Sequence, residues 1–247
     1  MQNWKILTFL ISIDSQVQLI MYSRVYVVIP VYNEASVIQD VIAEVQSVGN
    51  FRIVVVDDGS RDDTHNLACK CPGVVALRHL INRGKGAAIK TGITAAVRLG
   101  ADIVVTMDGD GQHDPEDIKT LIKPIQEDGM EVVLGTRARI KGEMPIIKII
   151  ANQIGNTITW ILYGLHVSDS QSGYRAYSRF AAEIIDTKAD KYEYDSKVIR
   201  EIHSNRLLFI EVPVKVRYTE YSMGKKQKQG FINGIKTLIR MVWDKFV

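Results

Sequence analysis

The chain has 247 residues, of which 46% are hydrophobic and 24% are charged. These values exclude a disordered or fibrous protein and are ordinary for one large globular domain or two small ones. The formal charge of +3 is uneven, because residues 215–245 carry +6 and the rest of the chain carries −3. A basic tail indicates an anionic partner such as lipid head groups, phosphate or nucleic acid, although a solvated basic face explains it equally well.

Cysteine content and hydropathy bear on the compartment. With only Cys69 and Cys71, a disulfide framework is not expected, and a reducing cytosol fits best. No stretch reaches the roughly 18–20 continuous apolar residues that span a bilayer. Residues 1–22 make a poor signal peptide and are expected to be an N-terminal extension. We therefore expect a cytoplasmic protein.

Strands and helices alternate along the first half of the chain. The expected strands are 25–29, 53–56, 74–77, 103–107 and 132–134, and the expected helices are 34–47 (capped by Asn33), 62–70, 85–99 and 115–126. Each strand is apolar throughout, which is typical of a parallel sheet covered by helices on both faces.

The pattern changes after residue 135. A long apolar helix is expected at 145–165, a short strand at 174–177, helices at 179–186 and 194–203, an edge strand at 207–216 and an amphipathic helix at 231–246. The sequence therefore predicts an α/β catalytic domain over residues 23–218 with a mostly parallel, Rossmann-like sheet. A basic loop and a C-terminal amphipathic helix follow over 219–247.

The stretch Asp108-Gly109-Asp110-Gly111-Gln112 directly follows an expected buried strand. Two carboxylates this close repel each other unless a cation lies between them. Carboxylate and amide oxygens suit Mg²⁺ or Mn²⁺, which usually keeps positions open for substrate phosphates. Asp108, Asp110 and Gln112 are therefore candidate metal ligands. A plain turn would explain an isolated Asp-x-Asp equally well.

Polar clusters follow three of the expected strands, at residues 30–34, 57–60 and 108–112. In open parallel sheets, ligands bind beyond the carboxyl ends of the strands. The three clusters are expected to share one rim, which makes the plain turn a poor explanation of residues 108–112.

The motifs VIPVYNE, VVDDGS, NRGKGAAI, DGDGQH and QSGYR resemble those of family-2 glycosyltransferases with the nucleotide-diphospho-sugar transferase fold. The resemblance is closest to polyprenyl-phosphate sugar synthases, such as dolichyl-phosphate mannose or glucose synthase, and runs from about residue 24 to 218. It implies that Pro30, Tyr32 and Glu34 line the base and ribose pocket. It further implies that Asp58 accepts a hydrogen bond from the base and that Lys85 touches the diphosphate.

The same resemblance assigns Mg²⁺ or Mn²⁺ to Asp108 and Asp110, with Gln112 as a further ligand. Asp108 thereby also binds the nucleotide, and Asp110 takes part in catalysis. The metal would neutralise the charge that develops on the departing nucleoside diphosphate. His113 is interpreted as a helix-start residue and not as a ligand.

Candidate acceptor residues follow the fifth strand and precede the sixth. Arg137 and Arg175 are similar to arginines that contact the acceptor phosphate in the synthases, although an ion pair with a rim carboxylate is the alternative. Asp169 is the candidate general base for an acceptor hydroxyl, with Glu193 and Asp195 as alternatives. A phosphate acceptor is already largely ionised at pH 7 and needs no base.

These features predict a metal-dependent, inverting hexosyltransferase. It would move a sugar from a UDP- or GDP-sugar to a polyprenyl (dolichyl) phosphate, as a peripheral protein on the cytosolic face of the membrane. Apolar stripes on helices 145–165 and 231–246 suit a membrane surface, and core or homodimer packing explains them too. The alternatives are transfer to a sugar hydroxyl of a growing glycan and a non-catalytic nucleotide-sugar or lipid-binding protein. Nucleotidyl transfer lacks its usual basic, glycine-rich signature, and no nucleic-acid partner is expected.

Overall fold

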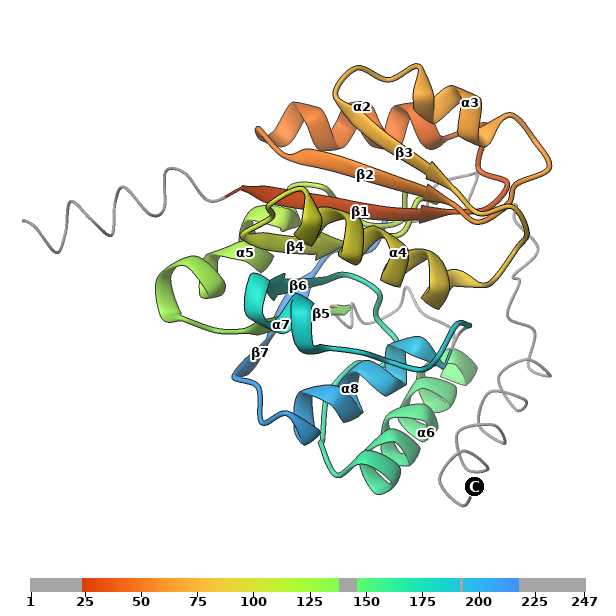
Figure 1. The fold of residues 1–247 in the computed structure, drawn as a ribbon. Coiled ribbons are helices and arrows are strands. Elements are labelled where there is room, and N and C mark those ends of the chain that lie inside the picture. Colours follow the sequence, from red (N-terminus) through yellow and green to blue (C-terminus); the bar gives the residue numbers. More distant parts are fainter. Residues whose placement is uncertain (1–23, 138–145, 192, 218–247) are drawn as a thin grey trace, which may run out of the picture.

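The computed structural model describes residues 24–137, 146–191 and 193–217 (Figure 1). Within them, one seven-stranded sheet has the order β3-β2-β1-β4-β6-β5-β7. The strands are β1 (Val25–Val31), β2 (Arg52–Asp57), β3 (Val74–Arg78), β4 (Ile103–Thr106), β5 (Val132–Arg137), β6 (Arg175–Ser178) and β7 (Phe209–Val214). The helices are α2 (Ile38–Val48), α3 (Thr64–Cys69), α4 (Lys85–Arg98), α5 (Asp117–Asp128), α6 (Ile146–Tyr163), α7 (Arg179–Ile184) and α8 (Tyr194–Ser204).

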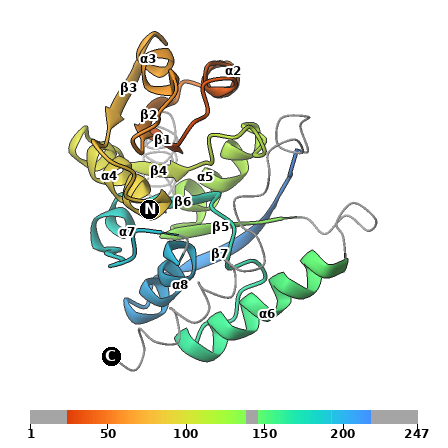
Figure 2. The ribbon, with the colours of Figure 1, turned by 90° about the vertical axis from the view of Figure 1, so that its right-hand side faces the viewer.

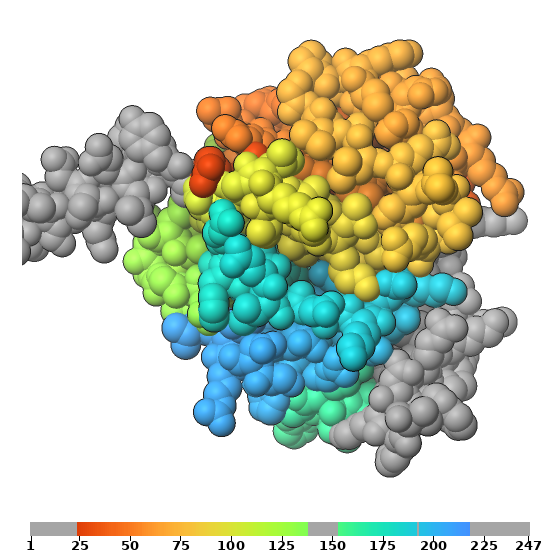
Figure 3. All heavy atoms as spheres, viewed as in Figure 1, coloured from red at the N-terminus to blue at the C-terminus, as the bar shows by residue number. Residues whose placement is uncertain are grey.

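Helices cover both faces of the sheet, and each face has its own apolar core (Figure 2). Alternate residues of β1 point to opposite faces, as the two-residue period of a strand requires. Val27 and Ile29 pack with α2, α3 and α5, whereas Tyr26 and Val28 pack with α4, α7 and α8. The surfaces over α4 and α7 meet in the space-filling view (Figure 3). The predicted α/β architecture is confirmed.

One strand departs from the parallel arrangement. β6 lies between β4 and β5 and runs antiparallel to both, with Arg175 opposite Thr106 and Leu134. Because β6 runs the other way, its first residue lies where β4 and β5 end. Residues 169–175 are thereby brought to the same edge of the sheet as the polar clusters. β7 is an edge strand, as predicted from Pro213.

The predicted start of the first helix is wrong. α2 begins at Ile38 and not at Glu34, and its N-cap residue is Val37. Asn33 does not cap the helix, because it adopts a left-handed backbone with φ of 55°. Its side-chain oxygen instead accepts a hydrogen bond from the backbone N–H of Arg61, at 2.9 Å.

The predicted N-terminal extension and the predicted helix at 231–246 lie outside the described residues. Among the helices that the structure does describe, none combines the length and the apolar character needed to cross a membrane.

Candidate active site

The carboxyl ends of β1, β2 and β4 form one rim, which Figure 2 shows at the near side of the sheet. Two of the polar clusters are tied directly together, because Ser60 Oγ accepts a hydrogen bond from the backbone N–H of Asn33 at 2.8 Å. The third cluster lies near enough to interact electrostatically with the first, since the charge of Glu34 is among the causes that raise the pKa of Asp110. The predicted common rim is therefore present.

The centre of the rim is an ammonium group between two carboxylates. Lys85 Nζ lies 2.7 Å from Asp108 Oδ1 and 3.7 Å from Asp195 Oδ2. Lys85 is the first residue of α4, whereas Asp195 lies in the first turn of α8. Three elements distant in sequence thus converge on one ion-pair cluster.

The pKa values of the two carboxylates of the Asp-x-Asp pair are shifted in opposite directions. Burial would raise the pKa of Asp108, but the charge and hydrogen bond of Lys85, together with His113 and Arg137, lower that pKa to about 2. Burial and the Asp108 charge together raise the pKa of Asp110. Burial would likewise lower the pKa of Lys85, but Asp108 and Asp195 raise it, so the ammonium stays charged. The site therefore holds Asp108 as a permanent anion.

His113 supports the loop from inside. The backbone N–H of Asp108 donates to His113 Nδ1 at 3.1 Å, and burial lowers the pKa of this imidazole. Its ring stacks on Tyr174, with centroids 4.5 Å apart. A ring nitrogen that accepts from the backbone supports the loop, and the exclusion of His113 from the metal ligands stays a prediction.

The residues predicted to bind a metal could supply only part of its ligand shell. Among the described residues, no three His, Cys, Asp or Glu side chains gather as a metal-binding group. The carboxylates of Asp108 and Asp110 and the Gln112 amide would supply oxygen ligands, and a diphosphate would have to complete the shell. The Asp108 charge raises the pKa of Asp110, and the Lys85 ammonium lies beside Asp108. Both observations show concentrated negative charge, which a divalent ion would neutralise.

Asp58 anchors the loop that leads into α4. Its two carboxylate oxygens accept hydrogen bonds from the backbone N–H groups of Arg83 (3.0 Å) and Gly84 (2.7 Å). His79 Nδ1 lies 2.8 Å from the same carboxylate. Asp58 thus positions Lys85 at the rim, and its predicted contact with a base stays a prediction. Pro30 is half-buried in β1 opposite Val56 of β2, Tyr32 is half-buried just after β1, and Glu34 is buried.

Arg137 and Asp169 form a bidentate ion pair. Arg137 Nε lies 2.6 Å from Asp169 Oδ2, and Nη2 donates to Oδ1 at 2.8 Å. The structure thus joins the candidate acceptor arginine and the candidate base in an ion pair with a carboxylate, which is the alternative that the sequence left open for Arg137. Both side chains are only partly buried, so the pair lies within reach of a ligand at the rim.

Arg175 lies beneath the rim and not on it. Its side chain is 1% exposed, and Nη2 donates to the carbonyl oxygens of Ser170 and Asp195, each at 3.0 Å. The guanidinium therefore fixes the loop before β6 and the start of α8. A direct contact with an acceptor phosphate, as predicted from the sequence, would require this guanidinium to become accessible.

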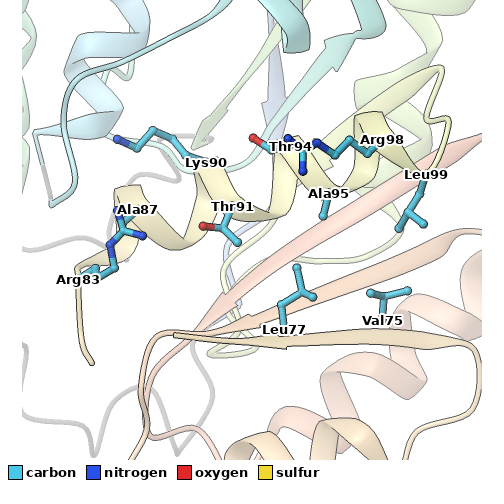
Figure 4. A pocket seen from close by; sticks show the side chains of 10 residues that line it. All are labelled: Val75, Leu77, Arg83, Ala87, Lys90, Thr91, Thr94, Ala95, Arg98 and Leu99. Atoms are coloured by element: carbon cyan, nitrogen blue, oxygen red, sulfur yellow. The ribbon is translucent and has the colours of Figure 1, made fainter. Parts of the chain in front are cut away.

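A groove of about 580 Å³ runs along the outer side of α4, away from the Asp-x-Asp loop (Figure 4). Leu77 and Val75 of β3 form one wall, and Lys90 lies at the opposite side of the view. Lys90 Nζ is engaged by the Asp190 carboxylate at 2.5 Å. The groove contains none of the predicted site residues.

The sequence of the chain matches a known family. Residues 26–185 match the family described as Glycosyl transferase family 2. The chain belongs to this family. This family-2 glycosyltransferase is 38% identical over 222 residues to a UDP-N-acetylglucosamine–dolichyl-phosphate N-acetylglucosaminyltransferase of Methanococcus voltae, covering 81% of this chain and 88% of that protein. It is 31% identical to the polyprenol monophosphomannose synthase of Mycolicibacterium smegmatis, covering 84% and 82% of the two chains.

The glycosyltransferase fold is also found among solved structures. Glucosyl-3-phosphoglycerate synthase from Mycobacterium tuberculosis, in complex with Mn²⁺, uridine-diphosphate and phosphoglyceric acid, matches with a TM-score of 0.71 and 20% identity. The match covers 94% of this family-2 glycosyltransferase and 82% of that chain. The family and fold that the sequence motifs predicted are confirmed.

Two features of the site escaped the sequence interpretation. Asp195 was considered only as an alternative base, whereas the structure places it beside Lys85. Gly173 was quoted only as part of a motif, yet a Cβ there would lie 2.7 Å from Lys85 Nζ. A glycine in the motif Gln-Ser-Gly-Tyr could have indicated a close approach of another group, but the sequence does not show that this group is Lys85.

Proposed function

We propose that this glycosyltransferase moves a sugar from a nucleoside-diphosphate donor to a polyprenyl phosphate at the cytosolic surface of a membrane, with inversion at the anomeric carbon and with Mg²⁺ or Mn²⁺. The observation that carries the proposal is the cluster of Lys85, Asp108 and Asp110 at the rim. Relatives named for dolichyl and polyprenol phosphate support the acceptor class. The structural neighbour solved with Mn²⁺ and uridine-diphosphate supports a metal and favours a UDP-sugar.

In this proposal, the chain's own residues divide the work. Asp108 and Asp110 would hold the metal, which would supply Lewis-acid chemistry at the leaving diphosphate. Lys85 keeps Asp108 ionised and lies where a further diphosphate oxygen can accept from its ammonium. Pro30, Tyr32 and Glu34 face the nucleoside, and Asp58 fixes the loop on which Lys85 stands.

A phosphate acceptor fits the surroundings of Asp169 better than a hydroxyl. Both oxygens of Asp169 accept hydrogen bonds from Arg137, which leaves this carboxylate poorly placed to take a proton. A phosphate oxygen brings its own negative charge and needs no base. We propose that Arg137 binds the acceptor phosphate and exchanges part of its contact with Asp169 for it. Arg175 supports this side of the site from below.

The donor is tested by thermal shift. We expect UDP- or GDP-sugars to raise the melting temperature only when Mn²⁺ or Mg²⁺ is present, because a ligand that binds the folded state stabilises it in proportion to RT ln(1+[L]/Kd). A screen of UDP-, GDP- and dTDP-sugars, each with and without metal, identifies the base. No shift with any donor would refute nucleotide-sugar binding.

The substitution Asp169→Asn distinguishes the two acceptor classes. We expect it to reduce transfer to a polyprenyl phosphate by no more than about 10-fold, mostly through a higher KM for the acceptor, because the Arg137 guanidinium loses its orienting partner. A catalytic base for a hydroxyl acceptor would instead contribute about 10²–10⁴-fold to kcat. Steady-state kinetics with both acceptor types measure the difference. A loss of kcat of about 1000-fold or more would favour the glycan acceptor.

Exposed apolar side chains support the proposed membrane contact. Leu80 is 100% exposed and Ile81 is 72% exposed in the loop before α4. On α6, Trp160 and Ile161 are 50% and 68% exposed. The two cysteines are free thiols, in accord with a reducing compartment.

We expect the double substitution Leu80→Ser and Ile81→Ser to weaken binding to anionic vesicles by about 10-fold or more, since each fully buried side chain of this size contributes about 1.5–3 kcal/mol. Sedimentation with phosphatidylglycerol-containing vesicles measures this. Leu208→Ser is the matched control, because Leu208 is 58% exposed but precedes β7 at the opposite end of the sheet. Equal binding by both variants and the unchanged protein would exclude this loop from the contact.

A further inference from the structure

The three residues after β7, which we call the clamp segment (residues 215–217), lie across the Asp-x-Asp loop and the start of α5. The backbone N–H of Lys215 donates to Asp117 Oδ2 at 2.6 Å. Val216 forms an isolated antiparallel bridge with His113. The backbone N–H of Arg217 donates to the carbonyl oxygen of Gln112 at 2.8 Å. The clamp segment thus makes backbone contacts along the loop that carries the candidate metal ligands.

The Arg217 side chain ties this loop to two further elements. Nη1 donates to Glu44 Oε2 on α2 at 2.6 Å, and Nη2 donates to Asp114 Oδ1 at 2.7 Å. Glu44 belongs to the helix that follows β1, whereas Asp114 lies between the loop and α5. One guanidinium therefore connects the end of the loop with α2.

The opposite side of the loop is held by Tyr174. Its ring stacks on His113, and its hydroxyl donates to the carbonyl oxygen of Asp114 at 2.8 Å. The loop is therefore fixed between Tyr174 at the start of β6 and Arg217 after β7. Within it, the backbone N–H of Gln112 donates to Asp110 Oδ1 at 3.1 Å.

We propose that Arg217 is a positioning residue that sets the geometry of the metal-binding loop. The inference rests on the proposed metal role of Asp108, Asp110 and Gln112. Two like charges and a left-handed glycine, Gly111 with φ of 75°, would otherwise favour a more open loop. By binding Asp114 and Glu44, the Arg217 guanidinium holds in place the segment whose backbone N–H contacts the Gln112 carbonyl, and it thereby keeps the three candidate oxygen ligands together before the metal binds. Partners of this kind, which orient ligands without touching the metal, commonly change metal affinity by 10–100-fold when they are removed.

The experiment compares Arg217→Ala, Arg217→Lys and the matched control Arg179→Ala in the full chain. Arg179 also carries a partly exposed ion pair, to Glu183 at 2.8 Å, but it lies on α7. Mn²⁺ binding is measured by the electron paramagnetic resonance signal of free Mn²⁺ with UDP or GDP present, because a diphosphate completes the metal's ligand shell, and a protein-free sample corrects for Mn²⁺ that the nucleotide binds alone. Hydrogen exchange of peptides that cover residues 108–117 is measured on the same samples.

We expect Arg217→Ala to weaken Mn²⁺ binding about 10-fold and to speed exchange over residues 108–117. Lysine restores one ion pair but not the two-armed contact, so Arg217→Lys is expected to fall between the two. At saturating Mn²⁺, the KM for the donor is expected to stay close to that of the unchanged enzyme. Arg179→Ala is expected to change neither Mn²⁺ affinity nor exchange in this loop.

Unchanged Mn²⁺ affinity and unchanged loop exchange in Arg217→Ala would overturn the inference. If the unchanged protein fails to bind Mn²⁺, the proposed metal role is wrong. Hydrogen exchange over residues 108–117 alone then decides whether Arg217 positions the loop. If Arg217→Ala does not fold, Glu44→Gln decides the matter, because it removes one arm of the contact and leaves the arm to Asp114.

Discussion

Replacing Asp108 with asparagine is expected to lower the rate of sugar transfer by at least about 1000-fold, which corresponds to about 4 kcal/mol of transition-state stabilisation. Asparagine keeps the shape of the side chain but removes the charge that Lys85 and a divalent metal both require. The permanent anion at this position is a property of the fold, since Lys85, His113 and Arg137 together lower the pKa of Asp108 to about 2 against the effect of burial.

Folding and catalysis must be separated in this test. The substitution leaves Lys85 with Asp195 as its nearest carboxylate, at 3.7 Å, so we expect a lower melting temperature but a folded protein. Asp102→Asn is the matched control, because Asp102 precedes β4 while Asp108 follows it, and its ion pair is with the exposed Arg24. The control is expected to keep full activity. Comparable activity losses in both variants would argue against a metal site at Asp108.

Gly173→Ala is expected to reduce transfer by about 10–100-fold with little change in melting temperature. A Cβ at this position would lie 2.7 Å from Lys85 Nζ and 3.1 Å from Asp108 Oδ1. The lysine end is flexible and can move aside, so the cost in folding free energy is small. Its movement, however, displaces the ammonium from Asp108, and a displacement of about 1 Å in an active site can cost about 100-fold in rate.

The backbone itself tolerates alanine here, because Gly173 has no positive φ. Gly155→Ala on α6 is the matched control, since a Cβ there meets no atom within 4 Å. We expect the Gly155→Ala variant to be as stable as the unchanged protein or slightly more stable, because alanine favours a helix more than glycine does. Kinetics and thermal melting on both variants test the pair. A fully active Gly173→Ala would mean that the Lys85–Asp108 contact does not matter for turnover.

The sequence predicts the sheet well where strands are buried on both faces. β1, β2 and β4 are continuous apolar runs, and polar residues follow them at once, so both the strands and the common rim could be inferred. The start of α2 was missed because Asn33 uses its side chain to bind Arg61 and takes a left-handed backbone instead of capping the helix. Local helix propensity does not reveal that Asn33 fails to cap the helix, because its side chain binds Arg61 in another loop.

The acceptor side could be predicted only in part. Arg137 and Asp169 were both identified, but their pairing depends on how the antiparallel β6 inserts between β4 and β5. The same insertion buries Arg175, whose residue type and motif suggested a surface role. Strand order and direction arise from tertiary packing, and a single chain's periodicity does not encode them directly.

Lys85 illustrates what the structure adds to a correct choice of residue. The sequence placed it at a helix start near a diphosphate, and its first partner in the structure is a carboxylate of the candidate metal site. The two roles are compatible, because an ammonium has three donors.

Transfer of labelled sugar into an organic-solvent phase is the most direct test of the proposed activity. The full chain is incubated with a radiolabelled UDP- or GDP-sugar, Mn²⁺ and a short polyprenyl phosphate, and the lipid product is extracted. We predict metal-dependent label in the organic phase, lost on chelation and in Asp108→Asn. Release of the nucleoside diphosphate with label that stays in the aqueous phase, or label in the lipid without any metal requirement, would contradict the proposal.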